Sequence, residues 1–136
     1  MADVPELSLD KVAWIHVDDG RLLTARNSGV TLFYLPGGRR APGESDADTL
    51  VREIAEELAV DVDPGSLEHV GTFEEPGSAG TVRRMTGYTG SHTGTPVATS
   101  EIEELRWLTL VDRHQVSTID QLVLDALAAT GRLRRR

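Results

Sequence analysis

The chain has 136 residues, a length that fits one compact domain. Hydrophobic residues make up 39% and charged residues 26%, a composition that excludes disordered and fibrous classes. Because there is no cysteine, disulfides, thiolate metal sites and cysteine nucleophiles are excluded, and any metal ion has to be bound by oxygen or histidine ligands. We therefore expect a single domain spanning residues 1–136.

The charge balance limits the partners of the protein. The formal net charge is −8, and such a surface repels polyanions at long range, so a nucleic-acid polymer is not an expected partner. The N-terminal segment does not resemble a secretory signal, and no apolar run approaches the roughly 20 residues of a membrane helix. We expect a cytoplasmic protein without membrane contact. The sequence leaves its oligomeric state open, a homodimer included.

The first half of the chain predicts strands followed by a helix. Strands are expected at residues 11–17, 21–26 and 30–35, where β-favouring runs are separated by turn residues. Ser45 or Asp46 is a suitable N-cap for a helix over about residues 46–59, in which apolar residues recur at helical spacing.

The second half of the chain predicts further strands and a closing helix. Strands are expected at residues 67–73, 82–89 and 102–110, between loops rich in Gly, Ser, Thr and Pro. Residues 118–130 predict a helix that ends before Gly131. This order of elements indicates an α/β fold, an α/β/α sandwich with a mixed β-sheet.

Acidic side chains share one face of the first predicted helix. Glu53, Glu56 and Glu57 stand at positions i, i+3 and i+4, where like charges destabilise a helix. A hard divalent cation such as Mg²⁺ would neutralise them, since it prefers carboxylate ligands and keeps waters for substrate phosphates. Taken alone, these glutamates also fit the solvated face of an amphipathic helix.

The residues around this helix form a longer motif. From Gly38 to Val60 the fixed positions read G-x5-E-x7-R-E-I-x-E-E-x-A-V. This pattern resembles the Nudix box, G-x5-E-x7-R-E-U-x-E-E-x-G-U, in which U is a bulky aliphatic residue. The strand leading into Leu35 to Gly38 and the later strand ending in Arg106-Trp107 are also similar to the family, so the resemblance covers most of the chain.

The resemblance implies a Nudix-like α/β/α fold and hydrolysis of a nucleoside diphosphate linked to another moiety. It also implies that Mg²⁺ is required and that Mn²⁺ is able to replace it. The physical logic agrees, because attack of water on a phosphorus surrounded by anionic oxygens needs charge neutralisation and an acidified water. The expected partner is therefore a small-molecule nucleotide.

The resemblance assigns roles to individual residues of the motif. Glu53, Glu56 and Glu57 become candidate metal ligands and catalytic residues, with Glu53 also a candidate general base. The carbonyl of Gly37 or Gly38 is a candidate further metal ligand.

The remaining polar positions of the motif receive supporting roles by the same resemblance. Arg52 is expected to orient the carboxylates through a salt bridge. Glu44 is expected to support the loop or to contact the metal through water.

Further candidates lie outside the motif. The family often adds an acidic residue from a later strand, and here Glu101 is the first candidate for that ligand. Glu104 is the second candidate for that ligand and is also a candidate substrate-binding residue. The alternative for both glutamates is that they are ordinary surface residues of an exposed strand. Arg39 and Arg40 are candidates for binding phosphate, although surface solubility explains them equally well.

The chain departs from the family motif at Ala59, where the family usually has Gly. A Gly just past a helix end typically adopts the left-handed conformation, in which Ala costs roughly 1 kcal/mol. We therefore expect strain at Ala59 if this residue is left-handed, and no effect on the carboxylates.

The substrate is left open between nucleoside triphosphates and nucleoside diphosphate sugars, including ADP-ribose. The alternative function is a Nudix-like module that binds or senses a nucleotide without cleaving it. The loss of motif carboxylates would favour that alternative, whereas here they are all present, which favours an enzyme of the pyrophosphohydrolase type.

Overall fold

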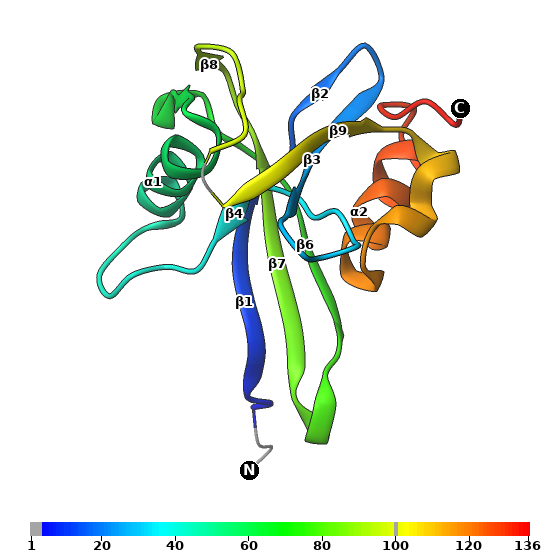
Figure 1. The fold of residues 1–136 in the computed structure, drawn as a ribbon. Coiled ribbons are helices and arrows are strands. Elements are labelled where there is room, and N and C mark those ends of the chain that lie inside the picture. Colours follow the sequence, from blue (N-terminus) through cyan, green and yellow to red (C-terminus); the bar gives the residue numbers. More distant parts are fainter. Residues whose placement is uncertain (1–3, 100) are drawn as a thin grey trace.

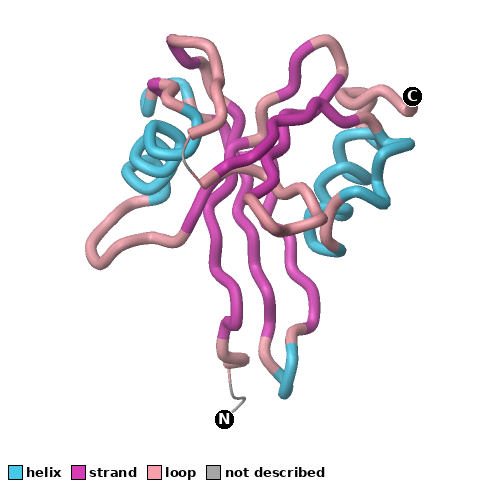
Figure 2. Tube along the Cα trace, viewed as in Figure 1, coloured by secondary structure: helices cyan, strands magenta, loops and turns pink. Residues whose placement is uncertain are grey.

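The strands of the protein lie between helices α1 (Asp46–Leu58) and α2 (Thr118–Ala129), which sit on opposite sides in Figure 1. The computed structural model describes residues 4–99 and 101–136. Figure 2 shows that the strands gather at the centre and that some extend well beyond the helices toward the N-terminus. This mixed α/β architecture confirms the predicted fold class.

The larger sheet is mixed. Its strands follow the spatial order β4 (Gly37–Gly38), β1 (Leu7–Trp14), β7 (Val82–Thr89) and β6 (Glu68–Pro76). Strands β1 and β7 run parallel, whereas β4 is antiparallel to β1 and β6 is antiparallel to β7. A parallel pair inside an otherwise antiparallel sheet requires a long crossover connection, and α1 lies in that connection.

Smaller antiparallel sheets complete the strand layer. One has the order β2 (Val17–Asp18), β3 (Arg21–Asn27) and β9 (Ile102–Leu108), and another joins β5 (Asp61–Val62) to β8 (His92–Thr93). Short 3₁₀ turns occupy Pro64–Ser66, Ser78–Gly80 and Leu110–Gln115.

Side chains that alternate along the end of β1 and into Ile15, the residue after it, build hydrophobic cores on both faces of the sheet. Val12 and Trp14 pack with the residues that face α1, whereas Ala13 and Ile15 pack with those that face α2. All of them are fully buried. Because successive strand residues point to opposite faces, one strand supplies both layers of the sandwich.

Helix α1 begins where the sequence predicted. Ser45 is the N-cap, with its hydroxyl accepting from the Asp48 backbone N–H at 3.1 Å and the Asp48 carboxylate accepting from the Ser45 N–H at 3.2 Å. The helix buries Leu50, Ile54 and Leu58 against the sheet. This packing fixes the rotation of the helix and leaves its glutamates on other faces.

The strand predicted at residues 30–35 is wrong. Only Phe33 and Tyr34 form isolated bridges in this described segment, Tyr34 with Ala25 and Phe33 with Val116. After Tyr34 the segment leaves the edge of β3, because Gly37 and Gly38 pair with β1 in the other sheet. A chain that crosses from one sheet to another cannot keep a continuous ladder with either.

Other strand boundaries also differ from the predictions. Strand β1 starts at Leu7 rather than Lys11, because its pairing with β7 continues to Val82, and it ends at Trp14. Strand β6 runs on to Pro76, and β9 ends at Leu108. Cross-strand pairing, which depends on partners distant in the sequence, sets these limits.

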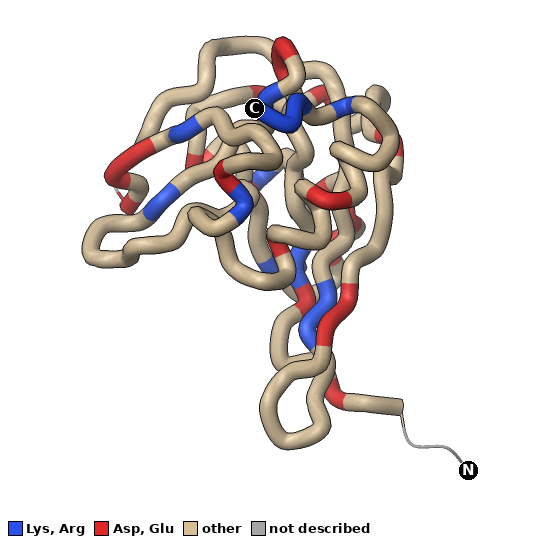
Figure 3. Tube along the Cα trace, turned by 90° about the vertical axis from the view of Figure 1, so that its right-hand side faces the viewer, with Lys and Arg blue, Asp and Glu red and all other residues tan. Residues whose placement is uncertain are grey.

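Opposite charges alternate along the extended part of the sheet (Figure 3). Arg83 and Arg84 of β7 pair with Glu75 and Glu74 of β6 at 3.0 and 2.7 Å. These arginines therefore have structural partners on the neighbouring strand.

Within the described residues, no helix combines the length and apolar character that crossing a membrane requires.

Ala59 follows α1 in the left-handed conformation, with φ 56° and ψ 38°. Its N–H donates to the carbonyl of Ala55, which closes the last turn of the helix. The side chain is exposed, so its methyl group gains little from packing. The strain expected from the sequence is therefore present.

Replacing Ala59 with Gly should stabilise the fold by up to about 1 kcal/mol, because Gly adopts this conformation without a Cβ clash. Urea unfolding of the variant and the wild type measures the difference. Ala55→Gly is a matched control inside the same helix and should destabilise the fold by about 1 kcal/mol. A less stable Ala59→Gly protein would contradict the prediction.

Candidate active site

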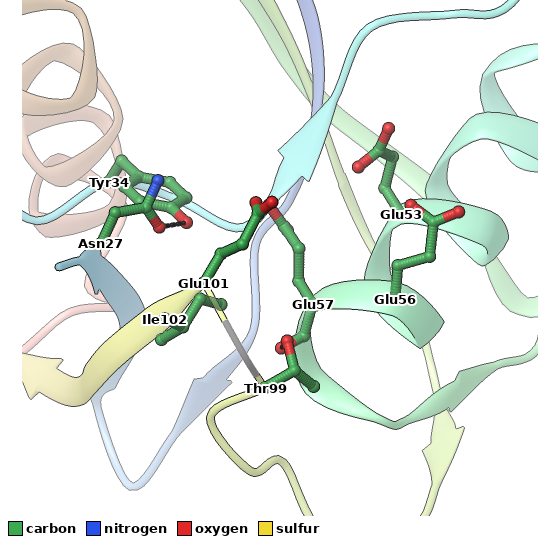
Figure 4. A pocket seen from close by; sticks show the side chains of 8 residues that line it. All are labelled: Asn27, Tyr34, Glu53, Glu56, Glu57, Thr99, Glu101 and Ile102. Carbon is green, nitrogen blue, oxygen red and sulfur yellow. Dashed lines mark hydrogen bonds between the residues drawn. The ribbon is translucent and has the colours of Figure 1, made fainter.

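A polar cavity of about 250 Å³ opens beside α1 (Figure 4). Its lining comes from α1, from the end of β3, from the segment before β4 and from the start of β9. The lining residues are Asn27, Tyr34, Glu53, Glu56, Glu57, Thr99, Glu101 and Ile102. The fold thus brings carboxylates from distant parts of the sequence to one cavity.

The carboxyl group of Glu57 connects α1 to β4. It accepts a hydrogen bond from the Gly37 backbone N–H at 2.9 Å. Burial raises the pKa of Glu57 to about 7, and the Gly37 N–H and the Lys11 ammonium oppose this effect. A group that is costly to ionise without a cation therefore lies at the base of the cavity.

Arg52 ties Glu53 to Glu44. Its guanidinium holds the Glu44 carboxylate in a two-point contact, with Nε–Oε2 and Nη2–Oε1 distances of 2.7 and 2.8 Å, and bonds Glu53 at 2.8 Å. Glu44 also accepts from the Ala41 N–H. Hydrogen bonds from Arg52, followed by that from Ala41, lower the pKa of Glu44 to about 2. Arg52 therefore restrains Glu53 at one end and the loop before α1 at the other.

Gly38 lies directly against Glu53. A Cβ at this position would overlap the Glu53 carboxyl group, with its Oε1 only 2.5 Å away. Only a glycine lets the backbone approach this carboxylate so closely. The Gly38 carbonyl is thereby kept in the neighbourhood of the acidic cluster.

Other candidates from the sequence divide between the cavity and the surface. Glu101 lines the cavity, and Figure 4 shows its carboxyl group ending near that of Glu57. Glu104 is not among the lining residues and pairs with Arg26 and Arg106 at 3.3 and 2.7 Å. The turn of the chain at the start of β9 separates these two glutamates.

The arginines that follow Gly38 do not line the cavity. Arg40 bonds Asp10 at 3.0 Å and Asp46 at 2.6 Å and thus braces the loop against β1 and α1. Arg39 is exposed, and its backbone carbonyl accepts from Arg52 at 3.1 Å. In this structure neither guanidinium is positioned at the glutamates.

Sequence reasoning missed Asn27, Tyr34 and Thr99. Asn27 lies between the strands expected at residues 21–26 and 30–35, Tyr34 lies in the second of them, and no local pattern marks either residue or Thr99 as a lining residue. The Thr99 hydroxyl donates to the Glu57 carbonyl at 2.8 Å, and the Tyr34 hydroxyl donates to Asn27 Oδ1 at 2.7 Å. These residues reach the cavity only because the fold brings separate segments of the chain together.

The donor set suits a hard divalent cation. Among residues 4–99 and 101–136, no three His, Asp or Glu side chains are already gathered in a metal-binding arrangement. Arg52 and the Gly37 N–H instead hold Glu53 and Glu57. The groups that converge on the cavity are nevertheless carboxylate oxygens, which Mg²⁺ and Mn²⁺ prefer.

Comparisons with known proteins identify the family and the fold. A model of the NUDIX domain matches residues 10–125. The solution structure of the ORF135 protein from E. coli is 26% identical, with a TM-score of 0.76 over 93% of this chain and 92% of that one. A MutT NUDIX hydrolase from Burkholderia pseudomallei is 22% identical, with a TM-score of 0.74 over 92% and 99% of the chains.

A UDP-X diphosphatase also has this fold. It is 20% identical, with a TM-score of 0.64 over 99% of this chain and 68% of its own. Comparison with curated proteins gives no match.

The chain belongs to the NUDIX family, as the motif from Gly38 to Val60 predicted.

The raised pKa of Glu57 predicts how metal-free stability depends on pH. As pH rises from about 4.5 to about 7, the unfolded chain loses this proton before the folded chain does, so this group removes stability over that window. Glu57→Gln does not titrate and should be more stable than the wild type at pH 8 by up to about 3 kcal/mol, with the difference vanishing near pH 4.

Chemical unfolding in EDTA at both pH values checks this result. Glu56→Gln is the matched control, because the Glu56 side chain is 62% exposed and its charge stays in water. An equal stability difference at pH 4 and pH 8 for Glu57→Gln would contradict the assigned burial of the charge.

Proposed function

We propose that this enzyme hydrolyses the pyrophosphate linkage of a nucleoside diphosphate joined to another moiety, with Mg²⁺ or Mn²⁺ as the cofactor. The observation that carries the proposal is the convergence of Glu53, Glu56 and Glu57 with Glu101 on one cavity. Such a concentration of carboxylates destabilises the metal-free protein and has a use only when a cation neutralises it.

The proposed cation ligands are Glu53, Glu56, Glu57 and Glu101, together with the Gly38 carbonyl. A divalent cation supplies charge neutralisation for phosphate oxygens and acidifies a bound water.

The chain's own residues supply position and proton transfer. Arg52 holds Glu53 in a fixed orientation against Gly38, where Glu53 serves as a metal ligand or as the general base that takes the proton of the attacking water. Glu44 keeps Arg52 in place through its two-point contact. The Gly37 N–H orients Glu57. Each of these contacts limits the motion of a reacting or ligating group, which lowers the entropic cost of reaching the transition state.

The proposed substrate class includes nucleoside triphosphates and nucleoside diphosphate sugars such as ADP-ribose. The structural likeness to a UDP-X diphosphatase supports the second group. The small volume of the cavity, about 250 Å³, suits a diphosphate with its metal ion and leaves the nucleoside and the second moiety outside. The proposed partner is therefore a small molecule. We also propose that the protein works in the cytoplasm.

A panel of nucleoside triphosphates and nucleoside diphosphate sugars, assayed with Mg²⁺ and Mn²⁺, tests the proposal. At least one compound should be cleaved at a phosphoanhydride bond, and excess EDTA should abolish the reaction. Binding of panel compounds without cleavage would favour the alternative of a nucleotide-sensing module. Full turnover in EDTA would contradict the role of the metal.

Glu57→Gln should lower the rate on the best substrate at least about tenfold, because a metal ligand loses its charge. Initial rates at saturating metal measure the effect. Glu68→Gln changes an exposed glutamate at the start of β6 and should stay within about twofold of the wild type. Wild-type activity in Glu57→Gln would rule out the proposed ligand role.

A further inference from the structure

The wall of the cavity opposite the glutamates is formed by Asn27 and Tyr34 (Figure 4). Tyr34 is held from several directions. Its backbone N–H and carbonyl both bond Ala25, at 2.8 and 2.9 Å, and the Lys11 ammonium lies 4.7 Å from the centre of its ring. Its hydroxyl donates to Asn27 Oδ1 at 2.7 Å. Tyr34 is therefore a fixed support for the Asn27 side chain.

Asn27 has a defined orientation for the same reason. It is the last residue of β3 and pairs with Ile102 of β9, which fixes its backbone. Because Oδ1 accepts the Tyr34 hydroxyl, the amide NH₂ is directed away from that bond. No hydrogen bond between described residues uses this NH₂ group.

The other lining residues offer no comparable donor. Glu53, Glu56, Glu57 and Glu101 are acceptors when ionised, and Ile102 is apolar. The Thr99 hydroxyl donates to the Glu57 carbonyl, and the Tyr34 hydroxyl to Asn27. Among the described lining residues, the Asn27 amide is thus the side-chain donor that remains for a ligand. This amide is therefore suited to bind an anionic ligand through one of the ligand's oxygen acceptors.

A neutral donor has an advantage at this position. An Arg or Lys side chain opposite the acidic cluster would form ion pairs with Glu57 or Glu101 and compete with the metal. An amide donates a hydrogen bond without adding charge, so it leaves the carboxylates to the cation. Asn27 is suited to contact a metal-neutralised anion from the wall opposite the glutamates.

We propose that Asn27 is a substrate-binding residue whose amide donates to an oxygen of the substrate's phosphate chain, and that Tyr34 is its positioning residue. The inference rests on the proposed function, since the phosphate chain is the part of the substrate that lies at the glutamates. It adds a protein contact on the far wall that no position in the sequence motif supplies.

The test measures binding of inorganic pyrophosphate with Mn²⁺ by calorimetry, beside binding of Mn²⁺ alone. Asn27→Ala should weaken pyrophosphate binding about tenfold, which is the usual loss for one hydrogen bond to a charged group, and leave the Mn²⁺ affinity within about twofold. Asn27→Asp keeps the size and the Tyr34 bond but replaces the donor with a negative charge, so it should weaken binding more. Tyr34→Phe should weaken it about threefold through lost orientation.

Ser28→Ala is the matched control, because Ser28 is the exposed neighbour and its backbone N–H, which bonds the Glu101 carbonyl, is retained. Its pyrophosphate affinity should stay within about twofold of the wild type. On the best substrate of the panel, Asn27→Ala should raise KM about tenfold while kcat changes less than about threefold. A structural disturbance of the metal site would instead lower kcat and the Mn²⁺ affinity together.

The outcomes separate this inference from the proposed function. Pyrophosphate binding in Asn27→Ala and Asn27→Asp equal to that of the wild type overturns the inference even if the wild type cleaves nucleotides. A wild type that cleaves nothing overturns the proposed function, and the ratio of pyrophosphate affinities still decides the role of Asn27. A wild type that does not bind pyrophosphate with Mn²⁺ overturns the inference.

Discussion

The hydrogen bond from the Gly37 N–H to the Glu57 carboxyl group is the contact on which the site depends. It joins α1 to β4, elements that the chain connects through a loop of seven residues between Gly38 and Asp46. Because Glu57 is partly buried and has this one backbone donor, loss of the bond would leave its carboxyl group poorly solvated. The position of α1 over the sheet, and with it the direction of every helix carboxylate, follows from this contact and from the apolar packing beneath it.

Electrostatics explains why the acidic cluster tolerates its own repulsion in the metal-free protein. Arg52 compensates Glu53 and Glu44 at the rim, where both side chains are partly exposed. On the other side, the recessed ammonium of Lys11 donates to the Leu35 carbonyl at 2.5 Å and lies within the field of Glu57 and Asp120, while burial lowers its pKa. The cations thus flank the cavity without filling it, which leaves the carboxylates available to a metal ion.

The sequence by itself determined the local features. Ser45, one of the two expected N-caps, caps α1, and Glu53, Glu56 and Glu57 follow helical spacing, because each of these features depends on residues within about one turn of helix. The same locality allowed the NUDIX family to be identified, since the motif is one continuous run of sequence. The mixed sheet was also predictable from the order of strands and helices, although not the strand boundaries.

Only the tertiary structure decided which residues from other segments reach the cavity. Glu101 and Glu104 look alike in the sequence, yet the turn into β9 brings one to the cavity and pairs the other with Arg26 and Arg106. Asn27 lies at the end of β3 and Tyr34 lies in the segment that crosses between sheets, and the fold brings both to the cavity of the glutamates. The physical reason is that helical spacing is set by hydrogen bonds a few residues apart, whereas a cavity is set by packing between segments that the sequence keeps far from one another.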